Sequence, residues 1–185
     1  MIITKDKKIA IFILVIILLL VGSFAVKTIY DKKHAVSEST RSIFADSEDD
    51  SVYYTDIHGN QISLEQYLGK ILVVTSWASW SPFSTTELTA LSELSIGYNQ
   101  EDVVFLAINR KETREQAERF INTLPALNSS LILVLDTRDH FYQSIGGYAM
   151  PETVIYDVRG NIVEYAHGTM NKDQIKQKID SLLKN

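Results

Sequence analysis

Three short and nearly uninterrupted apolar runs constrain the fold of this chain more than any other feature. They cover residues 71–77, 103–109 and 131–136. Short apolar runs of this kind are typical of strands whose two faces are both covered. Between them, apolar residues repeat at helical spacing over 83–98 and 113–124. This alternation predicts a central sheet that has helices on both faces.

Shorter elements are predicted before and after this region. Residues 52–56 and 61–63 flank the turn sequence His58-Gly59-Asn60 and are typical of a hairpin. A Ser-x-x-Gln sequence at 63–66 has the spacing of a capping box and predicts a short helix. The last predicted elements are a short helix over 139–145, strands over 153–156 and 162–166, and a final helix capped by Asn171. The resulting order is βαβαβ followed by ββα, which is compatible with one core.

An uncharged segment over residues 9–26 is the clearest indication of location. It follows a basic segment, residues 1–8, which contains three lysines. Its length is close to the minimum that an α-helix needs to cross about 30 Å of hydrocarbon. We therefore expect a transmembrane anchor, with the amino terminus inside and the globular part outside the cytoplasm. A cleaved signal peptide is the alternative, because Ser23-Phe24-Ala25 has the small-x-small pattern of a cleavage site.

Residues 27–51 separate the anchor from the globular part of the chain. They are rich in Ser, Asp, Glu and Lys and have few apolar side chains, so we expect a flexible tether. The globular domain is predicted over 52–185. The chain has a formal net charge of −5 and no long basic run, so we expect no nucleic-acid partner. The first partner that the sequence predicts is the membrane, through residues 9–26.

The segment from Gly69 to Ser84 resembles the strand, loop and helix start of TlpA-type membrane-anchored thiol–disulfide oxidoreductases. Those proteins carry Trp-Cys-x-x-Cys where this chain has Trp80-Ser81-Pro82-Phe83-Ser84. Ala149-Met150-Pro151-Glu152-Thr153 resembles the loop whose proline is cis in thioredoxin folds, and Glu87 also stands where the family commonly has it. The resemblance covers roughly residues 50–185. It implies an α/β thioredoxin-like fold, with a central mixed β-sheet flanked by helices, preceded by one N-terminal transmembrane helix.

Serine replaces cysteine at both positions of the redox motif, and the chain contains no cysteine. Residues 82–88 also resemble the peroxiredoxin segment around its peroxidatic cysteine, where Ser84 again replaces the sulfur. The thioredoxin reaction needs a thiolate at a helix N-terminus and a second thiol that resolves the mixed disulfide. A serine hydroxyl forms no disulfide and is a weak nucleophile without an adjacent base. We therefore expect Ser81 and Ser84 to be degenerate motif positions and not catalytic residues, and we expect no metal and no cofactor.

Three interpretations of these two serines remain open. The favoured one is that they cap the following helix, because a serine at a helix N-terminus satisfies free N–H groups. The second is an engineered replacement of cysteines. The third is a serine nucleophile, which needs a base within hydrogen-bond reach. None of the four histidines falls in a segment that matches the active site, so the third interpretation has the least support.

The rest of the degenerate site predicts a groove that binds a partner. We expect Trp77 in the core and Trp80 on the surface. Thr75 stands where related proteins have a buried acid or an asparagine, so no buried proton acceptor is expected there. The chain at Met150 and Pro151 would present a main-chain edge to an extended peptide. The predicted groove consists of Trp80, Ser81, Pro82, Phe83, Ser84, Met150 and Pro151.

These observations lead to one main functional hypothesis and two alternatives. The main hypothesis is a membrane-anchored thioredoxin-like domain without redox cysteines, which binds a polypeptide or a membrane-protein partner. The first alternative is a TlpA- or peroxiredoxin-type thiol–disulfide oxidoreductase whose active-site cysteines were substituted. The second is a structural module of a membrane complex. In all three, the chain is a single-pass membrane protein with an extracytoplasmic globular domain.

Overall fold

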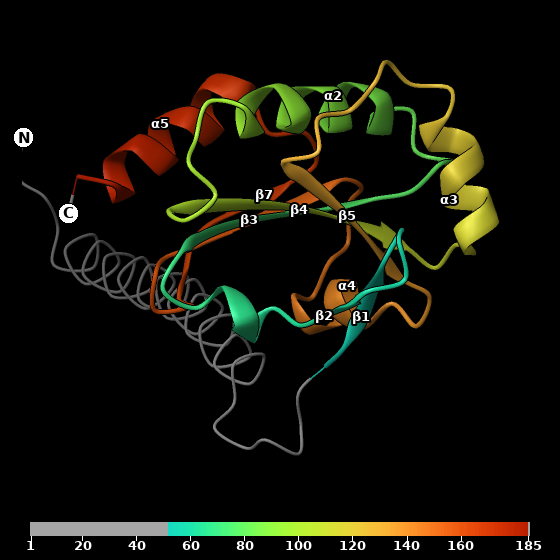
Figure 1. Ribbon diagram of the computed structural model, residues 1–185, viewed down its shortest axis with the longest axis horizontal. Helices are drawn as coiled ribbons and strands as arrows, with labels where there is room; N and C mark the ends of the chain where they lie inside the picture. The colour runs from blue at the N-terminus through green and yellow to red at the C-terminus, as the bar shows by residue number, and fades with distance from the viewer. Residues whose placement is uncertain (1–51, 185) are drawn as a thin grey trace, which may run out of the picture. The chain divides into compact units, whose positions relative to one another are not determined.

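Seven strands form one mixed sheet in the computed structural model, which describes residues 52–184 (Figure 1). The strand order is β2-β1-β5-β4-β3-β6-β7. Its centre consists of three parallel strands, β3 (Ile71–Trp77), β4 (Val103–Arg110) and β5 (Leu131–Asp136). These strands coincide with the three apolar runs, and β4 extends one residue further. The prediction of a central sheet built on these runs is confirmed.

Antiparallel strands extend the sheet on both sides. β6 (Glu152–Tyr156) pairs with β3, and β7 (Ile162–His167) pairs with β6. On the other side, β1 (Tyr54–Asp56) pairs with β5, and β2 (Gln61–Ile62) forms the predicted hairpin with β1. The sheet is therefore mixed, as the resemblance implied.

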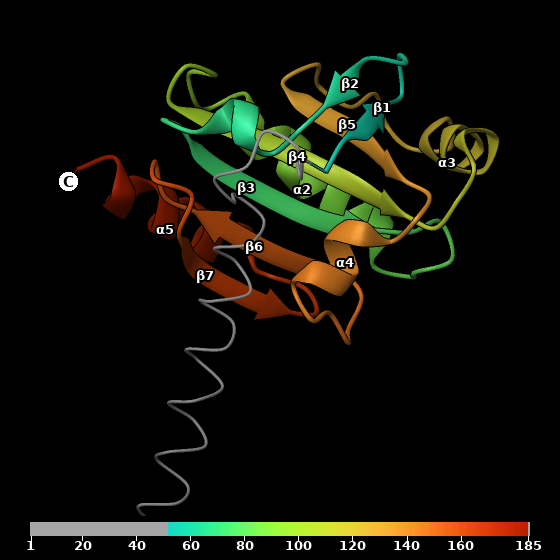
Figure 2. The ribbon, with the colours of Figure 1, turned by 90° about the horizontal axis from the view of Figure 1, so that it is seen from below.

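Helices cover the two faces of the sheet unequally. α2 (Ser84–Ser95), α3 (Arg114–Ile121) and α5 (Lys172–Leu182) lie on one face, where α2 and α5 contribute most of the apolar side chains. The short α4 (His140–Ser144) and the 3₁₀ helix η1 (Glu65–Tyr67) lie on the other (Figures 1 and 2). The predicted arrangement, with helices on both faces, is confirmed.

Alternation along β3 divides the apolar side chains between two cores. Ile71, Val73 and Trp77 belong to the core beneath α2, α3 and α5. Leu72 and Val74 belong to the core beneath α4. All seven residues of β3 are buried, which explains why its sequence shows no polar alternation. The only polar residues of β3 lie near its carboxyl end, where the candidate site is found.

Several details of the helices differ from the sequence-based expectations, and α3 ends at Ile121 and not at residue 124. α2 ends at Ser95 and not at residue 98, because the chain leaves the helix in a turn whose Gly97 N–H bonds to the carbonyl of Leu94. The capping box predicted at 63–66 is wrong, since the residue before η1 is Leu64 and no side chain caps this helix. Leu64 is buried in the core beneath α4, so apolar packing places this turn. By contrast, the predicted cap at Asn171 is confirmed.

The predicted basic segment, anchor and tether, residues 1–51, lie outside the described residues. The boundary of the globular domain at residue 52 therefore stays a prediction. Between residues 52 and 184, no helix is long and apolar enough to cross a membrane.

Candidate functional site

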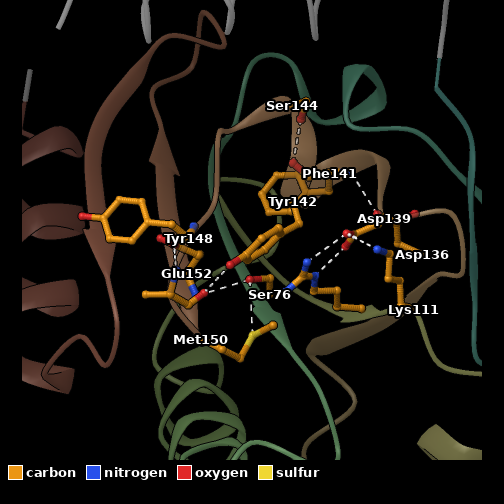
Figure 3. A network of polar contacts seen from close by, with 12 residues as sticks. Ser76, Lys111, Asp136, Asp139, Phe141, Tyr142, Ser144, Tyr148, Met150 and Glu152 are labelled. Carbon is orange, nitrogen blue, oxygen red and sulfur yellow. Dashed lines mark hydrogen bonds and ion pairs between the residues drawn. The ribbon is translucent and has the colours of Figure 1, made fainter. Parts of the chain in front are cut away.

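The two halves of the predicted site meet at the carboxyl end of β3. The pairing of β3 with β6 places Ser76 opposite Glu152, so the loop after β3 lies beside the loop before β6. The Ser76 Oγ lies 3.9 Å from the Sδ of Met150 and accepts the N–H of Glu152 at 3.2 Å (Figure 3). The peptide bond between Met150 and Pro151 is cis. The fold therefore brings the residues of segments 80–84 and 150–151 to one end of the sheet.

The loop between β3 and α2 exposes its aromatic side chains and buries its serines. Trp80 is 62% exposed and Phe83 is 50% exposed. Ser81 is only 4% exposed, and Ser84 is fully buried. Trp77 is also fully buried, and its indole N–H donates to the carbonyl of Ala107 at 3.3 Å. The expected placement of both tryptophans is thus observed, while the two serine hydroxyls point away from solvent.

The serine hydroxyls bond to the loop itself. The Ser84 hydroxyl donates to the carbonyl of Ala78 at 2.7 Å, and it accepts the N–H of Ala78 at 3.3 Å. The Ser81 hydroxyl accepts the N–H of Phe83 at 3.4 Å. The residue that precedes α2 is Phe83, and no side chain caps this helix. The favoured interpretation, helix capping by these serines, is therefore wrong, because Ser84 already lies in the first turn and closes the preceding loop.

Glu87, on the first turn of α2, carries a buried carboxyl group that bonds to β6. Its side chain is buried, and burial raises the pKa of Glu87 to about 7, although a hydrogen bond from Thr153 opposes the shift. The Thr153 hydroxyl donates to Glu87 Oε1 at 3.3 Å and lies 3.0 Å from the hydroxyl of Thr75. Position 75 itself holds no acid, but α2 supplies a buried carboxyl group that is linked to Thr75 through Thr153.

A second buried carboxyl group, from Glu112, holds the other side of the loop. It accepts the N–H of Ser79 at 2.9 Å and the hydroxyl of the same residue. It also accepts the side-chain N–H of Asn109, at 2.6 Å. Sequence reasoning missed Glu112. Its only signal was Asn109, a polar residue at the end of an otherwise apolar run.

A third buried carboxyl group, from Glu152, holds the loop before β6. Its Oε1 accepts the N–H groups of Tyr148, at 2.9 Å, and Ala149, at 2.7 Å (Figure 3). Its Oε2 lies 2.8 Å from Nδ1 of His167, whose ring stacks on Tyr148 with centroids 4.1 Å apart. β7 thus brings His167 beside the loop before β6, although no hydrogen bond joins it to Ser81 or Ser84 within the described residues. An acidic residue at the start of a buried strand was the available signal.

Tyr142 of α4 also contacts this loop. Its hydroxyl donates to the carbonyl of Ala149 at 2.9 Å. The guanidinium of Arg110 lies 3.5 Å from the centroid of the Tyr142 ring and donates to both carboxyl oxygens of Asp139. Burial acts to raise the pKa of Asp139, but Arg110 and Lys111 together lower it, so this carboxyl group stays ionised (Figure 3). Sequence reasoning missed this cluster, because its members come from two segments that are far apart in the chain, residues 110–111 and 139–142.

Comparison with known proteins identifies the family. The Redoxin family model matches residues 29–183. The chain belongs to the Redoxin family. Among curated relatives, the thiol-disulfide oxidoreductase ResA of Geobacillus thermodenitrificans is 30% identical over 132 residues, which are 69% of this redoxin and 72% of that protein. The thiol:disulfide interchange protein DsbE of Vibrio cholerae is 27% identical over 164 residues, which are 88% of this redoxin and 85% of that protein.

Solved structures support the same fold assignment. The pneumococcal exposed lipoprotein thioredoxin from Streptococcus pneumoniae has a TM-score of 0.64 and 21% identity, over 71% of this redoxin and 99% of that chain. A thioredoxin-like protein from Aeropyrum pernix has a TM-score of 0.59 and 18% identity, over 85% of this redoxin and 99% of that chain. The thioredoxin-like fold is therefore confirmed. Within this fold the redoxin has no cysteine, which is consistent with lost redox activity.

Proposed function

We propose that this redoxin binds an extended polypeptide segment at the site formed by Trp80, Phe83 and the main chain of Met150, without thiol chemistry. The observation that carries the proposal is the contrast within the site. Its sulfur positions hold buried serines that bond to the loop, while two neighbouring aromatic rings and a main-chain donor are open. Open aromatic side chains beside a main-chain N–H that has no acceptor are common features of peptide-binding surfaces.

Met150 supplies the main-chain part of the proposed site. Within residues 52–184 its N–H has no acceptor. An extended peptide can pair with such a group as an additional short strand, and its affinity then comes from main-chain hydrogen bonds and from side-chain contacts on either side. Trp80 and Phe83 precede α2 at the same end of the sheet, where they are available for those contacts.

The chain has no cysteine, and the two serines are not placed to act as nucleophiles in its stead. Neither hydroxyl bonds to a histidine or to a carboxyl group in the part of the chain that the structure describes. A serine becomes a strong nucleophile only when an adjacent base removes its proton. Ser84 is also fully buried, so a substrate cannot reach its hydroxyl without opening the loop. Binding without covalent exchange is the function that these features support best.

A peptide-binding measurement tests this proposal. Decapeptides are selected on the wild-type chain from a phage-displayed random library, and their affinities are measured by fluorescence anisotropy. Trp80→Ala and Phe83→Ala should each weaken binding by about tenfold or more, because exposed aromatic residues often dominate interfaces. Ile96→Ala is the matched control, since Ile96 is an exposed apolar residue at the opposite end of α2. Equal loss in all three variants, or no selected peptide, would contradict the proposal.

A second candidate function is favoured by Glu87. In this candidate the chain is a thiol–disulfide oxidoreductase whose two cysteines were substituted by Ser81 and Ser84. A buried carboxyl group with a pKa of about 7 is suited to proton transfer, and simple peptide binding gives it no task. Relatives that carry the names ResA and DsbE are described as thiol–disulfide proteins. Restoring the sulfur atoms distinguishes this candidate from the first.

We also propose that residues 9–26 anchor the chain in a membrane, with the amino terminus inside and the domain outside the cytoplasm. The uncharged character of these residues supports the proposal. Full-length chain should stay in the membrane fraction after alkaline carbonate extraction, whereas a chain without residues 1–26 should not. In intact spheroplasts, added protease should digest the globular domain. Full protection of the domain would contradict the proposed orientation.

A further inference from the structure

The loop that precedes β6 occupies its own main-chain donors except at one residue. The N–H groups of Gly146 and Gly147 bond to carbonyls of the α4 turn, at 3.0 and 2.9 Å. Pro151 has no N–H. The N–H of Glu152 donates to Ser76 Oγ. Over residues 146–152 this leaves three donors, at positions 148, 149 and 150, that could pair with an added strand.

Glu152 closes two of these three donors. Its Oε1 accepts both the Tyr148 N–H and the Ala149 N–H, at 2.9 and 2.7 Å. The carboxyl group is fully buried, and its other oxygen lies 2.8 Å from Nδ1 of His167. A side chain that is held on both oxygens cannot easily turn away to release the loop. Bonds between a buried carboxyl group and main-chain N–H groups are also stronger than bonds between neutral groups when the carboxyl is ionised.

Tyr142 occupies a main-chain acceptor in the same loop, the carbonyl of Ala149. Its hydroxyl donates to the Ala149 carbonyl at 2.9 Å, so both main-chain groups of Ala149 are occupied (Figure 3). The Tyr142 ring lies against the guanidinium of Arg110, which Asp139 holds through two hydrogen bonds. Tyr142 is therefore fixed by a cluster from β4 and the β5–α4 turn, independently of Glu152.

We propose that Glu152 and Tyr142 set the register in which a polypeptide pairs with this loop. They are positioning residues, because they occupy the main-chain groups next to Met150 and leave its N–H as the donor for a partner strand. This inference rests on the proposed polypeptide binding. Side chains of a strand alternate between its faces, so a slip by one residue would turn every side chain of the partner to the other face. Because the main-chain groups of Tyr148 and Ala149 are already bonded, the partner can pair only at Met150, and this restricts which of its side chains face the domain.

Residue-resolved hydrogen exchange on the full-length chain in detergent micelles tests the inference. The probe is the tightest-binding decapeptide selected on the wild-type chain. In the free chain, the amides of Tyr148 and Ala149 should exchange at least about tenfold more slowly than that of Met150. Added decapeptide should then slow exchange at Met150 and leave the other two unchanged.

Three variants separate register setting from general stabilisation. In Glu152→Ala, the decapeptide should also slow exchange at Tyr148 or Ala149, because those donors are now open. Glu152→Gln keeps an acceptor oxygen and should restore the wild-type pattern. Tyr142→Phe removes one hydroxyl and should weaken decapeptide binding without changing which free amides are slow. It serves as a milder variant if Glu152→Ala fails to fold.

Asp157→Ala is the matched control. Asp157 accepts the N–H groups of Arg159 and Asn161, each at 2.9 Å, in the turn at the opposite end of β6. Its removal should leave the exchange pattern around Met150 unchanged. Register setting is overturned if Tyr148 and Ala149 exchange as fast as Met150 in the free wild-type chain, or if the decapeptide protects the same amides in Glu152→Ala. If no decapeptide binds the wild-type chain, the proposed function fails, and the register inference fails with it.

Discussion

The Ser84 hydroxyl contributes to stability at a position where related proteins have a redox thiol. It forms two hydrogen bonds to Ala78, at 2.7 and 3.3 Å, and is fully buried. Ser84→Ala should lower the free energy of unfolding by about 1–3 kcal/mol, because it leaves the buried N–H of Ala78 without its acceptor, while the Ala78 carbonyl keeps only the N–H of Ser81. Urea unfolding followed by circular dichroism measures the change. Thr123→Ala, which removes an exposed hydroxyl bond to Phe120, should change stability by less than about 0.5 kcal/mol.

Glu87 predicts a pH dependence at the same scale. Its folded-state pKa of about 7 lies above the ordinary value of 4.5, because burial disfavours the charged form. Between these values the folded state binds more protons than the unfolded state, so the free energy of unfolding should fall as pH rises from about 4.5 to 7. Glu87→Gln should remove this fall, which is on the order of 3 kcal/mol. Urea unfolding at pH 4, 6 and 8 measures the difference between wild type and variant.

The control for this prediction is Glu101→Gln. Glu101 is an exposed residue, paired with Lys70 on the surface. Glu101→Gln and the wild type should differ in free energy of unfolding by nearly the same amount at every pH. If the free energy of unfolding of Glu87→Gln depends on pH as in the wild type, the Glu87 carboxyl group does not cause this dependence, and the prediction is contradicted.

At the scale of elements, α3 and α5 each begin with a capping box. Asn171 accepts an N–H of the first turn of α5, and Gln174 bonds back to the Asn171 N–H at 3.1 Å. Asn171→Ala should therefore lower the free energy of unfolding by about 1 kcal/mol. α5 packs Ile175 and Ile179 into the core beneath α2, so fraying of its first turn should also expose part of that core. Thermal unfolding measures the loss as a lower melting temperature.

Lys176→Gln is the control within the same helix. Lys176 forms an exposed ion pair with Asp180, at 2.6 Å. Exposed pairs at this spacing contribute about 0.3–0.5 kcal/mol, so the variant should melt close to the wild type. An equal decrease for both variants would indicate that α5 responds to any change of its surface and not to its cap.

At the scale of the whole molecule, restoring sulfur tests how much of a redox site the fold retains. In the double variant Ser81→Cys with Ser84→Cys, the first thiol precedes α2, where the helix N-terminus favours the thiolate. Glu87, on the first turn of the same helix, has a pKa raised by burial to about 7 and can accept a proton. The double variant should therefore reduce insulin with dithiothreitol measurably faster than the wild-type chain. Adding Glu87→Gln should slow that reaction.

Two other results would have a clear meaning. If the double variant is folded but no faster than the wild type, sulfur is not the only feature that the site lacks, and the oxidoreductase candidate is contradicted. If the single variant Ser81→Cys is as fast as the double variant, the reaction does not use a resolving thiol at position 84. Circular dichroism of each variant shows whether the loop change has disturbed the fold.

Most of the fold could be predicted, because the local spacing of apolar residues indicates the type of each main strand and helix. The apolar runs at 71–77, 103–109 and 131–136 became the three parallel strands, since a strand buried on both faces needs apolar residues throughout. The helices between them followed from apolar residues at helical spacing, and Asn171 capped the last one as expected. The resemblance also predicted a degenerate redox motif at residues 80–84, and the structure places these residues where β3 leads into α2.

The polar contacts of the site depend instead on residues that are distant along the chain. Glu112 bonds to Ser79, 33 residues away, and Glu87 accepts a bond from Thr153, 66 residues away. Periodicity reports which face of an element is buried, but it carries no information about which polar side chains from different elements meet. Ser84 differs, because its partner Ala78 is only six residues away, but its burial still depends on the packing of α2 over the sheet. The spacing of apolar residues in the sequence thus determines the strands, the helices and their buried faces. Which polar groups bond to the buried carboxyl groups is decided only by the tertiary structure, because packing brings distant segments together.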